Sequence, residues 1–280
     1  MHAFESPEHG ADFAQIQPRQ RRFDPLGKGN VHYDLKLGYP SSHTYALESV
    51  PQGARVLDIG SGPGGLAREL LKKHCTVTVV DQHAHQEELG DVQKMVQDLE
   101  DGVNFDAAAY DYLLLLDVIE HLKDPELFLE RLRSHFDHVP KRIILTTPNV
   151  AFLAQRVMLL LGQFNYGKAG ILDRTHTRLF TFGAFRRLLR DEGFRVKAVR
   201  GVPAPFPKIL GNGLLGRAAI AANVALIRLS KTVFSYQIFM EVESTPAAEF
   251  LVQDACAKSS PGNAGATAVD IRAGVRKASS

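Results

Sequence analysis

Short apolar runs alternate with segments of helical periodicity through the middle of the chain. The runs that predict strands lie at 55–59, 76–80, 92–96, 110–116 and 141–147. Helical periodicity lies between some of these runs, at 64–73 and 125–136. Strands that alternate with helices form βαβ units, so the pattern predicts an α/β fold with a mostly parallel sheet covered on both faces.

The same alternation continues toward the C-terminus and also precedes the first strand. Further helices are expected at 37–50, 150–161 and 182–192. Two more strands are expected, one at Phe194–Val199 and one at Ser235–Val242, where apolar and polar residues alternate. The pattern therefore predicts a sheet of seven strands.

Composition divides the chain into three parts. Residues 1–37 mix Gln, Arg, Pro, Gly and His with little periodicity, which predicts a flexible polar leader. Residues 38–243 contain the predicted strands and helices and are expected to form one domain. Residues 244–280 are rich in Ala, Ser, Gly and Lys, which predicts a disordered tail.

The overall composition narrows the class of protein only a little. With 45% hydrophobic and 23% charged residues, the chain resembles an ordinary soluble globular protein, and its net charge of +2 gives no reason to expect a nucleic-acid partner. Its cysteines, Cys75 and Cys256, argue against a disulfide framework and fit a reducing compartment. The first residues lack the basic patch and apolar run of a secretory signal. We therefore expect a cytoplasmic protein.

A glycine-rich turn follows the first predicted strand. Gly60, Gly62 and Gly64 allow a tight turn and close approach of the backbone to a ligand, and Asp81 ends the next strand about 20 residues later. That pairing predicts a nucleotide-like cofactor whose ribose hydroxyls bind the acid. Asp58, two residues before the first glycine, would repel a pyrophosphate and instead favours a cationic ligand.

These residues resemble motif I of the class I S-adenosylmethionine-dependent methyltransferases, whose cofactor carries an ammonium and a sulfonium but no phosphate. The resemblance implies a seven-stranded, Rossmann-like, doubly wound sheet with an antiparallel last strand. It also implies that Asp81 holds the ribose, that Asp98 meets the adenine amino group and that Leu99 lies against the ring. Asp98 is equally typical of a turn. The implied cofactor contacts are Asp58, Gly60, Ser61, Gly62, Gly64, Asp81, Gln82, Asp98, Leu99 and Asp117.

The segment Asp117–Leu122 follows the fourth predicted strand and resembles the corresponding segment of ubiquinone-type O-methyltransferases. A short helical turn would place Asp117, Glu120 and His121 on one side, because residues three and four apart are neighbours. His121 could then accept a hydroxyl proton. Alternatively, the acids and imidazoles could bind a divalent metal, as in the similar small-RNA 2′-O-methyltransferases. A third reading is that Glu120 and His121 only order the loop, and the proton-acceptor reading is favoured over the metal.

A second polar segment, Asp173–Thr181, lies between two predicted apolar helices and contains His176. On its path back to the sheet this segment would reach over the acceptor pocket, so His176 is a catalytic candidate beside His121. The alternative is structural: Thr177 or Thr181 caps the next helix, and Arg178 pairs with Asp173 at the surface.

An insertion at 201–232 separates the last two strands and contains an apolar helix at 214–229. Arg217 and Arg228 lie about 15 Å apart along that helix, too close to flank a hydrocarbon core of about 30 Å. The helix could lie on a membrane surface, cap the sheet, roof the acceptor pocket or dimerise. Packing and a homodimer are favoured over peripheral membrane contact.

The resemblance implies in-line transfer of a methyl group to a hydroxyl of a small molecule, a glycan or a lipid-linked intermediate. One alternative is a metal-dependent enzyme similar to RNA 2′-O-methyltransferases. Another is an NAD-type oxidoreductase, which would share the glycine turn but is opposed by Asp58. A protein that binds the cofactor without catalysis is a further alternative.

Overall fold

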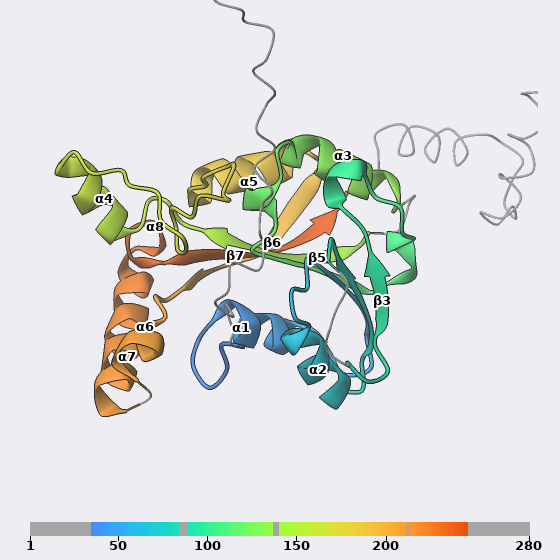
Figure 1. Cartoon of the computed structure of the whole chain (residues 1–280), viewed down its shortest axis with the longest axis horizontal. Helices are drawn as coiled ribbons and strands as arrows, with labels where there is room; N and C mark the ends of the chain where they lie inside the picture. The colour runs from blue at the N-terminus through green and yellow to red at the C-terminus, as the bar shows by residue number, and fades with distance from the viewer. Residues whose placement is uncertain (1–34, 84–88, 137–139, 212, 246–280) are drawn as a thin grey trace, which may run out of the picture. The chain divides into compact units, whose positions relative to one another are not determined.

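A computed structural model of the chain describes residues 35–83, 89–136, 140–211 and 213–245 (Figure 1). The predicted leader and the predicted tail lie almost entirely outside these ranges, as does Cys256. Cys75 is buried with a free thiol. None of the helices in the described ranges is long and apolar enough to cross a lipid bilayer.

Seven strands form one mixed sheet, with the spatial order β3-β2-β1-β4-β5-β7-β6. All neighbours are parallel except β7, which runs antiparallel to both β5 and β6. This arrangement confirms the predicted α/β, Rossmann-like fold with an antiparallel last strand. The strands are β1 (Arg55–Ile59), β2 (Thr76–Asp81), β3 (Gln93–Val96), β4 (Tyr112–Leu116), β5 (Arg142–Pro148), β6 (Phe194–Val202) and β7 (Gln237–Ser244).

Helices cover both faces of the sheet, as Figure 1 shows. One face carries α1 and α2, and the other carries α3 and α5. The helices are α1 (Ser42–Ser49), α2 (Gly65–Lys72), α3 (Pro125–Ser134), α4 (Leu153–Leu160), α5 (Phe182–Asp191), α6 (Phe206–Leu210), α7 (Leu214–Leu229) and α8 (Lys231–Phe234).

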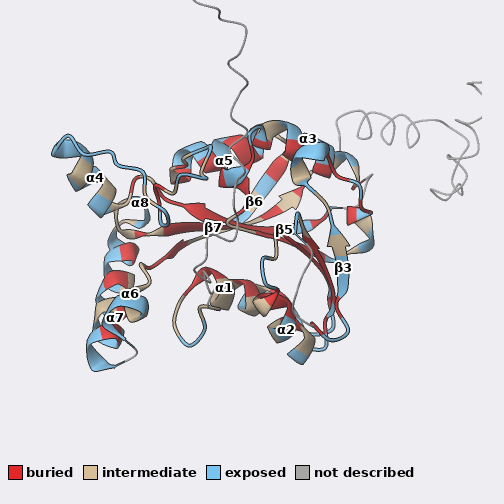
Figure 2. Ribbon diagram, viewed as in Figure 1, coloured by how far each residue is buried: buried red, intermediate tan, exposed pale blue. Residues whose placement is uncertain are grey.

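The period of two along the strands produces two hydrophobic cores (Figure 2). On β4, Leu113 and Leu115 pack in the core beneath α3 and α5, whereas Leu114 packs in the core beneath α1 and α2. Successive side chains of a strand point to opposite faces, so a strand covered on both faces must be apolar throughout. This requirement explains the uncharged run in the centre of the sheet.

Two predicted helices are shorter than the sequence pattern suggested. The helix expected at 37–50 begins only at Ser42, because the Ser41 side chain accepts a hydrogen bond from the backbone N–H of Thr44 and so caps it. The helix expected at 150–161 begins at Leu153. Before this helix, the backbone N–H of Val150 donates to the carbonyl oxygen of Phe180. Val150 is therefore paired with the segment before α5 and is not helical.

The topology brings several connections to one edge of the sheet. Because β6 and β5 are both antiparallel to β7, β6 runs in the same direction as the parallel strands, and all their carboxyl ends meet at that edge. The connections that leave β1, β2, β4, β5 and β6 therefore gather there. Figure 1 shows α4, α6, α7 and α8 at this end, on the left of the view. Ligands of open α/β sheets bind at such edges.

Candidate active site

The glycine turn after β1 has the backbone conformation that the sequence predicts. Gly60, Gly62 and Gly64 have φ values of 72°, 53° and 75°, in the left-handed region that favours glycine. A Cβ atom built on Gly60 would lie 2.5 Å from Cγ2 of Val118, so the turn presses directly against the segment after β4. The glycines therefore permit both the turn and this close contact between neighbouring strand ends.

Asp81, at the end of β2, is joined to the glycine turn. Its Oδ2 accepts a hydrogen bond of 2.9 Å from the backbone N–H of Gly62, and its Oδ1 accepts one of 3.0 Å from that of His83. The side chain is only partly buried. The structure thus brings together the two features from which the sequence predicts a ribose-binding acid beside a glycine turn.

Asp58 lies inside the sheet, opposite Val79 of β2 and Leu114 of β4, and is 3% exposed. Burial, together with the nearby Asp81 carboxylate, raises the pKa of Asp58 to about 7. A cation bound beside this side chain would favour its ionised form. The position is therefore suited to a positively charged ligand group and unsuited to a phosphate.

The remaining predicted cofactor residues are exposed or only partly buried. Asp98 caps a 3₁₀ helix at Leu99–Asp101, because its side chain accepts a hydrogen bond from the backbone N–H of Glu100 at 3.0 Å. This contact matches the alternative interpretation of Asp98 as a turn acid and leaves its adenine role a prediction. Leu99 packs partly buried against the main core, and Gln82 is exposed after β2. Ser61 lies partly buried within the glycine turn.

Asp117 adopts a left-handed conformation, with φ of 58°, which is uncommon for a residue other than glycine. Its carboxylate accepts hydrogen bonds of 2.7 Å from Thr146 Oγ1 and of 2.7 Å from Gln237 Nε2. Gln237 begins β7, and the sequence analysis did not identify it. The available signal was topological: the first residue of an antiparallel strand lies at the carboxyl edge of its parallel neighbours.

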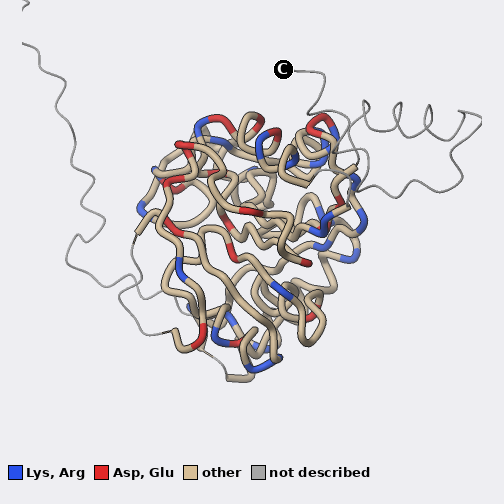
Figure 3. Tube along the Cα trace, turned by 90° about the vertical axis from the view of Figure 1, so that its right-hand side faces the viewer, with Lys and Arg blue, Asp and Glu red and all other residues tan. Residues whose placement is uncertain are grey.

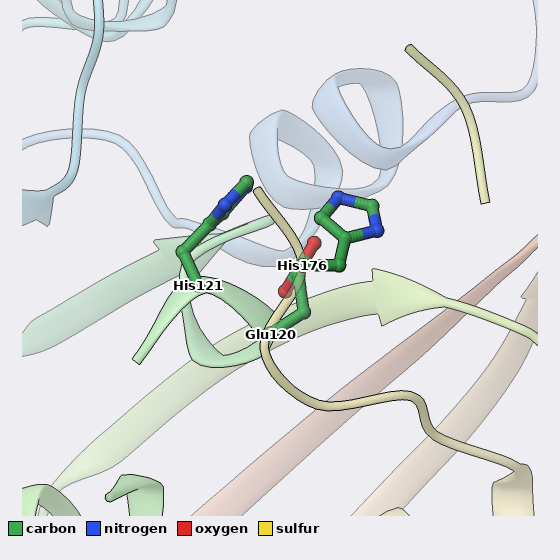
Figure 4. Close-up of side chains that lie close together, drawn as sticks. All are labelled: Glu120, His121 and His176. Carbon is green, nitrogen blue, oxygen red and sulfur yellow. The ribbon is translucent and has the colours of Figure 1, made fainter. Parts of the chain in front are cut away.

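Glu120, His121 and His176 form a compact group that we call the Glu–His–His cluster (Figure 4). Their ligand atoms all lie within 4.8 Å of one another, and the two imidazole rings meet edge to face with centroids 4.8 Å apart. Glu120 is buried and the imidazoles are partly exposed. Asp117 is not part of this compact group, but its carboxylate lies near enough to act on the pKa of both Glu120 and His121. Hydrogen bonds to Thr146 and Gln237 fix the position of the Asp117 carboxylate.

Backbone carbonyls orient both imidazoles. His121 Nδ1 lies 3.2 Å from the carbonyl oxygen of Thr175, and His176 Nδ1 lies 2.9 Å from that of Ile171. A carbonyl oxygen can only accept a hydrogen bond, so Nδ1 must carry the proton in each ring. A neutral imidazole in this tautomer has its lone pair on Nε2, ready to accept a proton or to bind a metal.

Burial favours the uncharged forms of Glu120 and His121. Both carboxylate oxygens of Glu120 are buried without a hydrogen-bond partner within normal geometry. Burial, with the Asp117 carboxylate adding to it, raises the pKa of Glu120 well above its usual range. Burial and the neighbouring His176 lower the pKa of His121, so its imidazole is neutral at physiological pH. A buried carboxyl group without partners is costly as an anion, so it favours either the protonated form or a bound ligand that completes it.

Two chain segments far apart in sequence are hydrogen-bonded to form the cluster. The carbonyl oxygen of Glu120 accepts from the backbone N–H groups of Thr177 at 2.8 Å and Arg178 at 3.1 Å. Arg178 forms an ion pair with Glu126, so the predicted surface pair with Asp173 is wrong. Asp173 instead accepts from the backbone N–H of Thr175, which tightens the turn before His176. Thr181 caps α5, as one alternative interpretation of this segment held.

Comparison with known proteins gives the family. Residues 32–199 match the sequence model of the family described as "Methyltransferase domain". The ubiquinone biosynthesis O-methyltransferase of Salmonella enteritidis is 31% identical over 113 residues, which cover 37% of this chain and 44% of that protein. The (S)-tetrahydroprotoberberine N-methyltransferase of Eschscholzia californica is 33% identical over 98 residues, which cover 30% and 27% of the two chains. The chain thus spans less than half the length of either of these curated relatives.

Among solved structures, the Burkholderia thailandensis 1,6-didemethyltoxoflavin-N1-methyltransferase aligns over 73% of this chain and 76% of its own, with a TM-score of 0.48 and 16% identity. That structure contains S-adenosylhomocysteine. Since the family model matches more than half of the chain, the chain belongs to the methyltransferase domain family, as a class I S-adenosylmethionine-dependent methyltransferase. The cofactor of this class is S-adenosylmethionine.

Proposed function

We propose that the chain transfers the methyl group of S-adenosylmethionine to a hydroxyl oxygen of a small-molecule, glycan or lipid-linked acceptor. The observation that carries this proposal is the Glu–His–His cluster at the carboxyl edge of the sheet, with an imidazole Nε2 lone pair available on both histidines. A hydroxyl must lose a proton when its oxygen is methylated, and this cluster offers imidazole proton acceptors beside the predicted cofactor site.

The proposed step is an in-line displacement. The acceptor oxygen attacks the methyl carbon, the bond from that carbon to the sulfonium sulfur breaks, and S-adenosylhomocysteine leaves. The hydroxyl proton passes to Nε2 of His121 or His176. Alignment of the two reactants can lower the barrier by about 7–11 kcal/mol, and a positioned base typically adds a factor of ~10²–10⁴ in rate.

The relatives support oxygen or nitrogen as the atom methylated. One is an O-methyltransferase of ubiquinone biosynthesis and another is an N-methyltransferase of a protoberberine. A free amine needs no base once it is unprotonated, whereas a hydroxyl of ordinary acidity does. The paired imidazoles therefore favour a hydroxyl acceptor.

A metal-assisted version of the same reaction is the second candidate, and the unpartnered carboxylate of Glu120 favours it. Two imidazoles and one carboxylate are a donor set suited to divalent transition metals, and ring nitrogens oriented through Nδ1–H are usual around such ions. Glu120, His121 and His176 would hold the ion. When bound, it would supply Lewis acidity that lowers the pKa of an acceptor hydroxyl.

The test is a screen for transfer of a radiolabelled methyl group from S-adenosylmethionine to hydroxylated quinone precursors, glycans, lipids and RNA. The proposal expects alkali-stable incorporation into a hydroxyl-bearing acceptor by the intact protein. Methylation only of amines or of carbon would contradict it, and labelled RNA would favour the RNA-methylating alternative. Loss of activity in chelator, with recovery on adding a divalent ion, would select the metal-assisted version over the proton-acceptor version.

A further inference from the structure

Exposed apolar side chains are concentrated in two segments of the described chain. Apart from Leu37, Val96 and Leu127, the large apolar residues that are exposed all lie in residues 153–166, here the α4 segment, or in residues 209–229, here the α6–α7 segment. Leu160 and Leu214 are each 86% exposed. The others are Leu153, Val157, Leu159, Leu161, Phe164, Tyr166, Ile209, Leu210, Leu215, Leu226 and Leu229.

The charge around these segments has one sign. No Asp or Glu occurs between residues 149 and 172 or between residues 202 and 236. The same stretches contain several cations: Arg156, Lys168, Lys208, Arg217, Arg228 and Lys231. By contrast, Figure 3 looks onto the end of the sheet that carries β3 and shows acidic and basic residues interspersed. Exposed apolar groups in stretches whose charged residues are all cations match an anionic lipid surface, in which acyl chains lie beneath negatively charged headgroups.

The two segments belong to one structural unit beside the Glu–His–His cluster. Asn149, just before α4, donates through Nδ2 to the carbonyl oxygens of Thr232 at 2.9 Å and Ser235 at 2.8 Å. The rings of Phe152 and Tyr236 also meet edge to face, with centroids 5.8 Å apart. The connection from the α4 segment to α5 then carries His176 itself. The apolar segments are therefore attached to the same connection that carries His176 of the cluster.

Only one narrow side of α7 is used for packing. Its buried residues are Gly216, Ile220, Asn223 and Ile227, which recur at intervals of three or four and form a single stripe. Asn223 fixes the helix to its surroundings by accepting from the backbone N–H of Ala204 and donating to the carbonyl of Phe234. The leucines near both ends of α7 are exposed and therefore make no contribution to the core.

We propose that the α4 and α6–α7 segments together dock the protein on an anionic lipid bilayer. At 16 residues α7 is shorter than the ~20 residues that span a bilayer, so the helix would lie in the interface. A second copy of the chain is a poorer occupant of the same surface. A two-fold contact places the same patch on both partners, and here that patch contains cations without any acids to pair with them.

Docking of this kind would hold the Glu–His–His cluster at the membrane surface. If the proposed methyl transfer is correct, the acceptor is then an amphiphile whose hydroxyl-bearing head lies in the interface, because such a molecule can reach the cluster without leaving the membrane. This consequence rests on the proposed function, whereas lipid binding itself does not.

The experiment is co-sedimentation of the intact protein with phosphatidylcholine vesicles that contain or lack phosphatidylglycerol. We expect binding to the anionic vesicles only, weakened by salt. Leu160→Ser/Leu161→Ser and Leu214→Ser/Leu215→Ser should each reduce partitioning about tenfold or more. Arg217→Gln/Arg228→Gln should reduce it roughly fivefold for each charge removed. These side chains are exposed, so S-adenosylhomocysteine binding should persist and report an intact fold.

Two controls match these changes at other sites. Val96→Ser removes an apolar side chain that is 63% exposed on β3, and Arg186→Gln/Arg187→Gln removes two exposed charges from α5. Both should bind vesicles as the unaltered protein does. Absence of vesicle binding, or equal loss in the control variants, would overturn the proposal. A concentration-dependent dimer that the leucine variants abolish, without any vesicle binding, would assign the surface to a second copy and would also overturn it.

Discussion

The glycine turn after β1 and the Glu–His–His cluster after β4 lie at the same edge of the sheet, but they are stabilised differently. Three closely spaced glycines and Asp81, which follows about 20 residues later, define the turn. The cluster instead joins residues more than 50 positions apart through backbone hydrogen bonds to Glu120 and carbonyls that orient two imidazoles. The proposed cofactor site is thus largely local in sequence, and the proposed acceptor site is a product of tertiary structure.

We propose that this difference separates the part of the site common to a class from the part that selects a substrate. A turn that needs left-handed glycines and a buried acid tolerates few substitutions. Because it would contact only the cofactor, it can serve any reaction that uses that cofactor. Connections after β5 and β6 can change in length and composition while the sheet persists. The α4 and α6–α7 segments are such connections, and they carry most of the exposed large apolar side chains of the described residues.

The largest expected effect comes from the acceptor region. Replacing His121 and His176 together by Gln should lower turnover ~10²–10⁴-fold, because the hydroxyl proton loses its acceptor. Binding of S-adenosylhomocysteine should change little, since neither side chain belongs to the glycine turn. Methyl transfer under single-turnover conditions measures the first effect and titration calorimetry the second. Full activity of the double variant in chelator would leave alignment alone to explain catalysis.

In the cofactor region, Gly60→Ala should destabilise the fold as well as the site. A residue with Cβ costs ~1–2 kcal/mol in the left-handed conformation, and the clash with Val118 adds ~1–3 kcal/mol. Gly53→Ala is the matched control, because Gly53 has φ of 77° but open space around it. Urea unfolding should therefore show a larger loss for Gly60→Ala. Equal losses would show that the turn does not press on Val118.

A pH effect should distinguish Asp58 from the other acids of the cofactor region. Its pKa is about 7 in the folded chain against 3.8 in the unfolded chain, so the folded state retains a proton that the unfolded state releases. Stability of the cofactor-free protein should therefore fall as the pH rises from about 4 to about 7. Affinity for S-adenosylhomocysteine, whose amino group is cationic, should rise as the pH passes about 7.

Asp58→Asn is the variant that isolates this effect. It should flatten both pH profiles, weaken binding at high pH, and raise the melting temperature of the cofactor-free protein above pH 7. Thermal melts and titrations across the same pH series provide the two profiles. Unaltered slopes in the variant would assign the pH dependence to another group.

The smallest effect concerns the surface pair that accompanies the acceptor loop. Arg178 and Glu126 are each about two-fifths exposed, so Arg178→Gln should change the free energy of unfolding by at most ~1 kcal/mol. Backbone hydrogen bonds to Glu120 hold this loop independently of that side chain. Urea unfolding at low and high salt measures the effect. A loss much above this size would mean that the ion pair, rather than the backbone, fixes the loop.

Much of the fold could be predicted from the sequence because its signals are local. The uncharged run of β4 and the apolar residues of β1 and β2 need burial on both faces, and the glycines of the turn need left-handed backbone. The conformation and contacts of Asp117 could not be predicted from the sequence. Its left-handed conformation and its bond to Gln237, 120 positions away, depend on the antiparallel placement of β7.

The same limit explains the errors around His176. A sequence pairs Arg178 with the nearby Asp173, whereas the fold places Glu126 of α3 within reach of Arg178. The ring partners of His121 and His176 are backbone carbonyls, which have no sequence signature at all. The sequence pattern also predicts two helices that begin too early. Ser41 caps α1 at its true start, and Val150, before α4, is hydrogen-bonded to Phe180.

The most direct test of the division between the two regions is titration of S-adenosylhomocysteine and NAD into three proteins: the unaltered chain, Asp81→Ala and His176→Gln. Loss of the charge-assisted contacts of Asp81 typically costs ~1.5–3 kcal/mol, so Asp81→Ala should weaken S-adenosylhomocysteine binding about tenfold or more. His176→Gln should bind it as the unaltered chain does, and NAD should bind none of them. Unchanged affinity in a folded Asp81→Ala protein, or tight binding of NAD, would contradict the account.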